Sequence, residues 1–521
     1  MSEVKMIKIF DTTLRDGTQS PDVNFSVRDK LEIAKALDEF GVDYIELGWP
    51  GSNPKDMEAF LEASQLKLKN AQIVAFGSTK RKGMSASEDK NLKAIVDSKA
   101  NAACIFGKTW LVHVEKQLGI SAEQNLAAIT ESIDFLKSKK LPVFYDMEHF
   151  FDGYKDDREY ALSCIKAAGS ADCIVLCDTN GGSLPNEVRT IVREAIQYMK
   201  DNGIEKSLGV HFHNDSGAAV ANTIAAVEEG VMEVQGTING FGERAGNADL
   251  CQIIPNLMLK KKIKLNVDLA NLTYVSRLLY TLANIKPNHS QPYVGKNAFS
   301  HKAGIHVDAV MKGATYEHID PLSVGNKRDI ILSDLSGKSN IVQIAKKCGY
   351  NVSKEDKGTE SMLKEVEMME KQGYDIGNLF AEQLLLVDRY FGKGKDYFSI
   401  KTWKVMSEQR NGEFSESVVT GTVDGKKREV VAPVEGGPVD AMFSALLKMI
   451  STNYKQIKEI KLINYKVMIA EEKGAESSVR VYIEFRNGKE EWGTVGVSPN
   501  ILEASLLAIE KGFKYFLIKH C

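Results

Sequence analysis

The stretch VRDKLEIAKALDEFGVDYIELGWP, residues 27–50, carries the pattern that decides the fold. Its first half places apolar side chains at i, i+3, i+4 and i+7, which predicts an amphipathic helix. The apolar run that follows predicts a strand. The same alternation continues along the chain and predicts eight strands, at 6–12, 44–50, 72–78, 102–107, 142–149, 172–179, 207–214 and 233–239.

Eight strands alternating with helices predict an α/β fold in which residues 1–267 form a closed (β/α)8 TIM barrel. An open doubly wound sheet is the competing architecture. Beyond the barrel, 268–393 is expected to be a helical linker and flap region. Residues 394–521 show three strands and a helix twice over, with the first strand of the second half expected at 457–469. This pattern predicts a C-terminal α+β domain built as a duplicated βββα unit. One apolar face per sheet favours pairing with a second copy, hence a homodimer.

The composition excludes several classes of partner. The charges of the 67 basic and 70 acidic residues of this 521-residue chain nearly cancel, and no stripe of Lys and Arg is long enough to track the phosphate backbone of a nucleic acid. We therefore expect no nucleic acid partner. The start lacks the sections of a signal peptide, and no apolar run approaches membrane-spanning length. We therefore expect a cytoplasmic protein with no membrane partner. The seven scattered cysteines form no C-x-x-C pair and are interpreted as reduced thiols.

The ends of the strands carry the unusual residues, as expected where a barrel gathers its reactive groups. The first strand ends in FDTTLRDGTQ, with Arg15 and Asp16. In LGVHFHND, the alternation of side chains along a strand places His211 and His213 on one side. Alone, a His-x-His pair is most simply two hydrogen-bonded polar side chains. Together with Asp16, two nitrogens and a carboxylate suit Zn²⁺, Mn²⁺ or Mg²⁺ and leave coordination positions for a 2-oxo acid.

Other strand ends add polar residues to the same rim. VFYDMEHF and IVLCDTNGG supply Glu148 and Thr179, each of which alone would be read as a structural rim residue. The last strand runs into GTINGFGERAGNADL, whose glycines do not form a dinucleotide fingerprint. This loop is interpreted as a tight turn that presents Glu243, Arg244 and Asn247.

Four long segments together carry a family resemblance: DTTLRDGTQ, HFHNDSGAAVAN, QGTINGFGERAGNADL and HKAGIHVDAV. In this order they resemble the 2-isopropylmalate, homocitrate and citramalate synthase family, over essentially the whole chain. Within it, ELGWPGSNPKD at 46–56 and QPYVGKNAFSHKAGIHVDAV at 291–310 are similar to the citramalate branch. The resemblance implies an acyltransferase that condenses acetyl-CoA with pyruvate to give citramalate and free CoA. It also implies a divalent metal ion at Asp16, His211, His213 and Asn247.

The resemblance also implies roles for individual residues. Arg15 would face the keto oxygen of the substrate and stabilise the alkoxide, and Thr179 would hold the substrate carboxylate. Glu148 would act in the acid-base step together with His306, which lies beyond the barrel and would come from the neighbouring subunit.

Two further residues follow His306 in a segment that, by the resemblance, would form a flap over the active site. Asp308 would bind substrate and Tyr316 would take part in catalysis. The 2-isopropylmalate synthases carry their tyrosine further on, in the stretch matching VGNKRDIILSDLSGKS, which contains none. This departure favours the citramalate branch and leaves the role of Tyr316 open.

The C-terminal domain resembles the regulatory domain of the family, which implies isoleucine as feedback effector. Phe76 and Phe106 at two strand ends are candidates for closing the pocket around the methyl group of pyruvate. Three alternatives stay open: a 2-isopropylmalate synthase, a lyase related to hydroxymethylglutaryl-CoA lyase, and a non-catalytic amino-acid sensor.

Overall fold

The computed structural model of the chain forms two compact units, and each is described by itself. The first comprises residues 1–299 and 319–327, and the second comprises 300–318 and 328–521. The structure describes residues 6–301, 316–333, 336–374, 376–377, 379–392, 394–409, 413–470, 477–488 and 490–521.

A closed barrel of eight parallel strands forms the centre of the first unit, with the strands in chain order around it. The barrel confirms the predicted fold class and rules out the open sheet. Its strands are β1 (Lys8–Asp11), β2 (Tyr44–Gly48), β3 (Gln72–Ser78), β4 (Ala102–Lys108), β5 (Val143–Glu148), β6 (Cys173–Asp178), β7 (Ser207–Phe212) and β8 (Glu233–Gly236).

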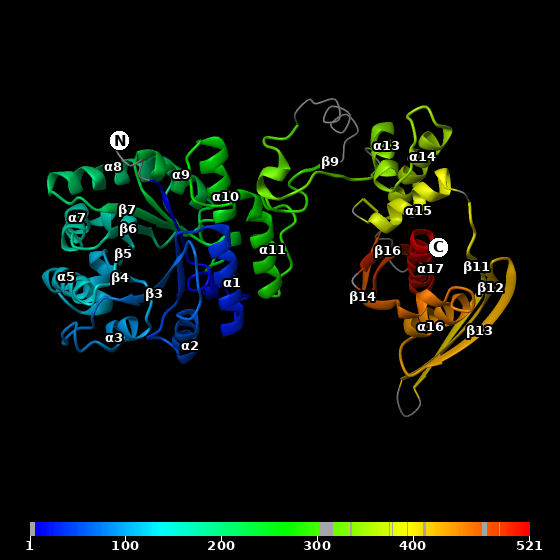
Figure 1. The fold of residues 1–521 in the computed structure, drawn as a ribbon, viewed down its shortest axis with the longest axis horizontal. Helices are drawn as coiled ribbons and strands as arrows, with labels where there is room; N and C mark the ends of the chain where they lie inside the picture. The colour runs from blue at the N-terminus through cyan, green and yellow to red at the C-terminus, as the bar shows by residue number, and fades with distance from the viewer. Residues whose placement is uncertain are drawn as a thin grey trace. The chain divides into compact units, whose positions relative to one another are not determined.

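Helices surround the barrel (Figure 1). Their bounds are α1 (Val27–Phe40), α2 (Pro54–Ala63), α3 (Lys90–Asp97), α4 (Leu111–His113), α5 (Ala122–Ser138), α6 (Phe150–Asp156), α7 (Arg158–Ala167), α8 (Pro185–Asp201), α9 (Ala219–Glu229), α10 (Leu250–Pro255) and α11 (Leu272–Leu282). Local chemistry fixes both ends of α1. The hydroxyl of Ser26 accepts from the Asp29 amide, and the Asp29 carboxylate accepts from the Ser26 amide. Gly41 ends the helix at φ 99°, where a Cβ would lie 2.2 Å from the carbonyl oxygen of Asn266.

The interior of the barrel is partly aromatic and partly charged. Phe10, Phe144 and Phe76 belong to one buried cluster inside the strands. The carboxyl groups of Glu46 and Asp146 are buried in the same interior. A buried carboxylate is costly unless it is paired, so these two groups mark a part of the interior where a cationic partner is expected.

The second unit contains helices followed by two three-stranded antiparallel sheets. Its first part contains β9 (Ser300–His301), β10 (Asp329–Ile330), α13 (Lys338–Lys347), α14 (Lys357–Lys371) and α15 (Phe380–Phe391). The second part contains β11 (Phe398–Gln409), β12 (Glu413–Val423), β13 (Lys426–Val434), α16 (Pro438–Ile450), β14 (Lys461–Ile469), β15 (Val479–Asn487), β16 (Glu490–Ser498) and α17 (Ile501–His520). The duplicated βββα prediction is confirmed.

Two local details of the second unit differ from the prediction. The strand expected at 457–469 begins only at Lys461, because Lys455–Glu459 forms a 3-10 turn. The short parallel pair of β9 and β10 was not predicted.

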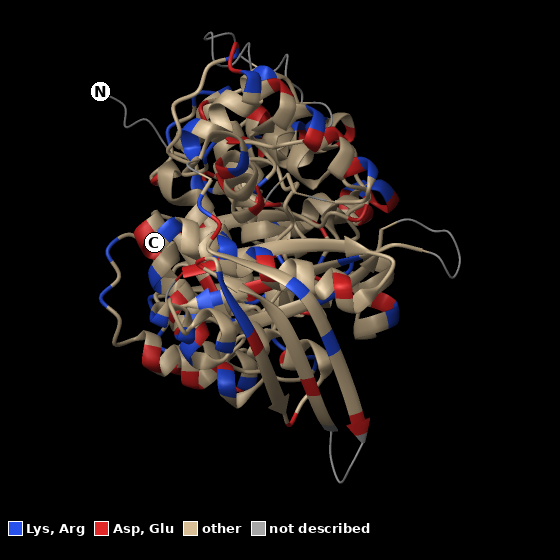
Figure 2. Ribbon diagram, turned by 90° about the vertical axis from the view of Figure 1, so that its right-hand side faces the viewer, with Lys and Arg blue, Asp and Glu red and all other residues tan. Residues whose placement is uncertain are grey.

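Lysine, arginine, aspartate and glutamate are interspersed along the helices and strands (Figure 2). Among the described residues, no helix is long and apolar enough to cross a membrane.

Candidate metal centre and active site

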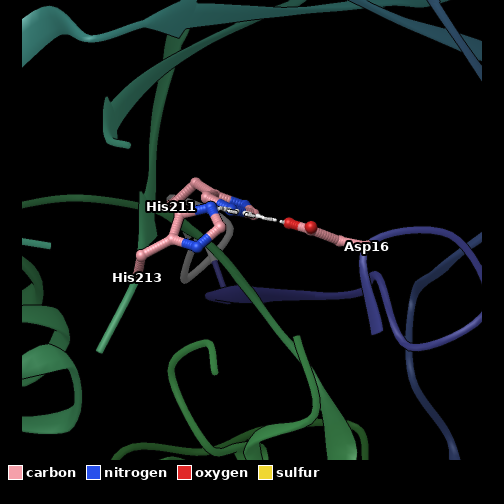
Figure 3. Close-up of side chains that lie close together, drawn as sticks. All are labelled: Asp16, His211 and His213. Atoms are coloured by element: carbon pink, nitrogen blue, oxygen red, sulfur yellow. Dashed lines mark hydrogen bonds and ion pairs between the residues drawn. The ribbon is translucent and has the colours of Figure 1, made fainter. Parts of the chain in front are cut away.

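Asp16, His211 and His213 come together at the carboxyl ends of β1 and β7 (Figure 3). Asp16 Oδ2 lies 3.1 Å from His211 Nε2 and 3.8 Å from His213 Nε2. The two Nε2 atoms are 3.4 Å apart, and all three side chains are buried. His213 follows β7 directly and forms a bridge with Asn247, which brings the loop after β8 to the same place.

Buried acceptors around this triad fit a cation. The amide nitrogen of Asn247 donates to Asp16 Oδ2 at 2.8 Å, whereas Asn247 Oδ1 and Asp16 Oδ1 are buried without a hydrogen bond among the described residues. A guanidinium nitrogen of Arg15 lies 3.5 Å from Asp16 Oδ1. A buried polar atom without a partner costs about 1 to 3 kcal/mol. Two imidazoles, one carboxylate and an amide oxygen are a donor set that a divalent ion accepts.

The pKa values of the triad reflect burial and Arg15. Although burial opposes ionisation of Asp16, the charge of Arg15 and the bond with His211 hold its pKa below the usual value. Burial lowers the pKa of His213 to about 4, so this imidazole is neutral at pH 7, as a metal ligand must be. Burial also disfavours the charged form of His211, but the bond to Asp16 outweighs it and raises the His211 pKa. Metal binding at His211 therefore competes with a proton.

Arg15 is held rigidly beside the triad. Its Nε donates to Glu46 Oε2 at 2.6 Å, and its guanidinium carbon lies 3.6 Å above the ring of Phe76. Burial raises the pKa of Glu46 to about 7 despite the charge of Arg15. The sequence patterns did not single out Glu46, which lies in the middle of β2, because its importance lies in its contact with Arg15 beyond the end of β1.

A cavity of about 200 Å³ opens above these groups. Phe76 and Phe106 stack with ring centroids 5.4 Å apart, and Trp49 meets them edge-on at 5.5 and 5.7 Å. Trp49 therefore completes an aromatic wall of which only the two phenylalanines were expected. The cavity is lined by Arg15, Asp16, Gln19, Trp49, Phe76, Phe106, Asp146, Glu148, Cys177, Thr179, His211, His213, Glu243 and Arg244.

The polar side of the cavity contains Glu148 and Thr179. Glu148 forms an ion pair with Lys108 Nζ at 2.5 Å, and Lys108 was not expected from the sequence. The hydroxyl of Thr179 accepts from the His149 amide at 2.8 Å. Arg244 donates to the Thr179 carbonyl at 2.7 Å. These bonds fix both predicted residues at one rim.

Three further residues were predicted for the active site: His306, Asp308 and Tyr316. His306 and Asp308 lie outside the described residues. Tyr316 belongs to the second compact unit, and 52% of its surface is exposed. The roles that were expected for these three residues stay predictions.

Three family models match consecutive parts of the chain. The HMGL-like model covers residues 6–279, and the Homocitrate synthase post-HMGL domain-like model covers 293–373. The LeuA allosteric (dimerisation) domain model covers 374–517.

Full-length relatives narrow the family further. The (R)-citramalate synthase of Sulfolobus acidocaldarius is 46% identical, over 98% of this chain and 97% of that protein. The (R)-citramalate synthase of Geobacter sulfurreducens is also 46% identical, over 99% and 98%. A probable 2-isopropylmalate synthase of Archaeoglobus fulgidus is 31% identical, over 98% and 97%. The chain therefore belongs to the (R)-citramalate synthase family.

Proposed function

We propose that this chain condenses acetyl-CoA with pyruvate and water to give (R)-citramalate and free CoA. The observation that carries the proposal is the triad of Asp16, His211 and His213 beside Arg15, at the base of a small cavity with an aromatic wall. A bidentate 2-oxo acid needs a cationic site of this kind, and the cavity wall leaves little room for a large side chain.

Four residues would hold a divalent ion, with Zn²⁺, Mn²⁺ and Mg²⁺ as candidates: Asp16, His211, His213 and Asn247. When bound, such an ion polarises the keto group of the 2-oxo acid as a Lewis acid. Arg15, fixed by Glu46 and Phe76, would donate to the oxygen on which negative charge develops. Thr179 and Asp308 would hold the carboxylate of pyruvate.

The acetyl methyl group must lose a proton before it can attack the keto carbon. Glu148 lies in the cavity, and Lys108 holds its carboxylate in place. We assign Glu148 to this acid-base step together with His306 of a second subunit, with Tyr316 on the flap. Hydrolysis of the thioester would then release the product and CoA.

The other functions considered fit less well. A hydroxymethylglutaryl-CoA-lyase-like activity leaves the LeuA-type domain at 374–517 without a role, and so does an inert barrel. A 2-isopropylmalate synthase would need more space around the side chain of its keto acid, and the stacked rings of Phe76 and Phe106 line the cavity where we place that side chain.

We further propose that the protein is a cytoplasmic homodimer. Residues 1–267 would be catalytic, 268–393 would form the linker and flap, and 394–521 would pair the subunits and bind isoleucine as feedback effector. The allosteric (dimerisation) domain match supports pairing and regulation by the C-terminal part of the chain; it covers 374–517 and so begins before residue 394.

The test uses full-length protein loaded with each candidate metal in turn. With methyl-¹³C acetyl-CoA and pyruvate, we expect one thiol released per molecule of labelled citramalate, resolved as the R enantiomer. Chelated protein should release none, and added metal should restore the rate. Full turnover in a metal-free sample would contradict the metal site, and thiol release without citramalate would contradict the reaction.

A further inference from the structure

A hydrogen-bonded path leads from His211 into the interior of the barrel. The Nδ1 atom of His211 lies 2.9 Å from Gln235 Oε1. The amide nitrogen of Gln235 donates to Asp146 Oδ1 at 3.1 Å. Gln235 has no exposed surface, and His211 and Asp146 are also buried. The burial of all three side chains limits the competition of water for these bonds.

The path determines which ring nitrogen of His211 carries its proton. An amide oxygen only accepts hydrogen bonds, so the nitrogen that faces Gln235 Oε1 must be Nδ1–H. The lone pair of Nε2 is then left for the metal site, where Nε2 points toward Asp16 (Figure 3). Asp146 fixes the orientation of the amide, because a flipped Gln235 would place its oxygen against the carboxylate.

The bond from Gln235 to Asp146 crosses the barrel. Gln235 lies on β8, whose neighbours in the sheet are β7 and β1, and Asp146 lies on β5. The contact is therefore a side-chain bridge through the interior and not part of a strand ladder. A buried amide that is satisfied at both ends in this way restricts the side chains it joins.

The second histidine of the triad has no such support. His213 Nδ1 is buried and has no hydrogen-bond partner within the described part of the chain. One ligand of the metal site is thus oriented by a relay and the other is not. A metal-binding histidine is usually oriented by an acceptor on its other ring nitrogen, and loss of that acceptor weakens metal binding.

We propose that Gln235, braced by Asp146, is a positioning residue of the metal centre that keeps His211 in the Nδ1–H tautomer. The proposal rests on the metal site of the proposed function. Gln235 does not touch the substrate and acts only through His211. A carboxylate at this position would still accept from His211, but it could not donate to Asp146.

The experiment measures metal affinity, independently of turnover. Mn²⁺ is titrated calorimetrically into metal-free, full-length protein of wild type, Gln235→Leu, Gln235→Glu and Gln383→Leu. Gln383 is a matched control, since it is a buried glutamine of α15 whose amide donates to the Gly377 carbonyl at 2.8 Å. We expect Gln235→Leu to bind Mn²⁺ roughly 10- to 100-fold more weakly. Gln235→Glu should bind more tightly than Gln235→Leu, and Gln383→Leu should match wild type.

The proposal would be overturned if Gln235→Leu bound Mn²⁺ within twofold of the wild-type affinity, or if Gln383→Leu lost as much Mn²⁺ affinity as Gln235→Leu. If Gln235→Leu does not fold, the tautomer of His211 in the wild-type protein tests the proposal instead. In Zn²⁺-loaded protein with ¹⁵N-labelled histidine, His211 should show a slowly exchanging Nδ1–H, and coordination through Nδ1 would refute the relay. A wild type that binds neither Mn²⁺ nor Zn²⁺ would refute the metal site itself.

Discussion

Replacement of Arg15 by lysine should remove transition-state stabilisation while leaving the fold intact. The guanidinium meets two demands at once: Nε binds Glu46 at 2.6 Å, and the planar group lies 3.6 Å above Phe76, leaving other N–H groups for the substrate. A lysine ammonium has no planar fork and cannot stack while it pairs with Glu46. Loss of one donor to a developing oxyanion typically lowers kcat about 10²- to 10³-fold, or about 2.7 to 4 kcal/mol.

The assay is thiol release at saturating metal, with kcat and KM for pyruvate measured separately. Arg158→Lys is the control, because Arg158 is an exposed residue of α7 that pairs with Glu194. It should keep the rate of wild type. A lysine variant of Arg15 that retains more than about a tenth of kcat would refute the role given to this residue. Loss of metal binding in that variant would show that Arg15 acts on the triad instead.

Three further predictions concern stability, assembly and regulation. Burial raises the pKa of Asp11 to about 7, so the folded chain binds this proton more tightly than the unfolded chain does. The stabilisation that comes from the bound proton is therefore complete below pH about 4 and is lost as the pH rises through about 7. Asp11→Asn should therefore flatten the fall in unfolding free energy between pH 5 and 7, a fall of at most about 1.4 kcal/mol per pH unit for one group, and an unchanged slope in urea unfolding would count against this. Mixing inactive His306→Ala with inactive Arg15→Ala chains should restore part of the activity, and no recovery despite verified subunit exchange would place His306 in its own chain's site. Isoleucine should inhibit the full-length enzyme more than leucine and should have no effect on a version ending near residue 393, with typical couplings of about 5- to 150-fold in apparent substrate affinity; isoleucine binding that survives the truncation would contradict the proposed site.

The fold was predictable because its signals are local. Each barrel strand is a short apolar run between amphipathic stretches, and these periods can be read without knowledge of distant contacts. The error at 457–460 has the same origin. Ile457 and Ile460 are both buried, and β-branched residues are typical of strands, but these two belong to a 3-10 turn and the residue that follows it. Periodicity alone does not separate the two over so few residues.

The candidate site was predictable only for residues that share one strand or that lie at the carboxyl ends of the barrel strands, where a barrel gathers its reactive groups. His211 and His213 share a strand face, and Asp16 follows the end of β1. Glu46, Lys108 and Gln235 were missed because their importance lies in contacts between strands. Nothing in the local pattern around Gln235 indicates that its amide reaches Asp146 across the barrel.

The ratio of kcat/KM for pyruvate to that for 2-oxoisovalerate tests the central claim most directly. It is measured by thiol release with metal-loaded, full-length protein, with each 2-oxo acid varied at saturating acetyl-CoA. One extra methylene in a tight pocket typically costs about 10- to 200-fold, and the side chain of 2-oxoisovalerate has two more carbons than that of pyruvate. The larger acid should therefore be disfavoured by at least about 100-fold in the cavity lined by Trp49, Phe76 and Phe106. Equal or higher kcat/KM for 2-oxoisovalerate would contradict the proposed substrate and the role of the aromatic wall.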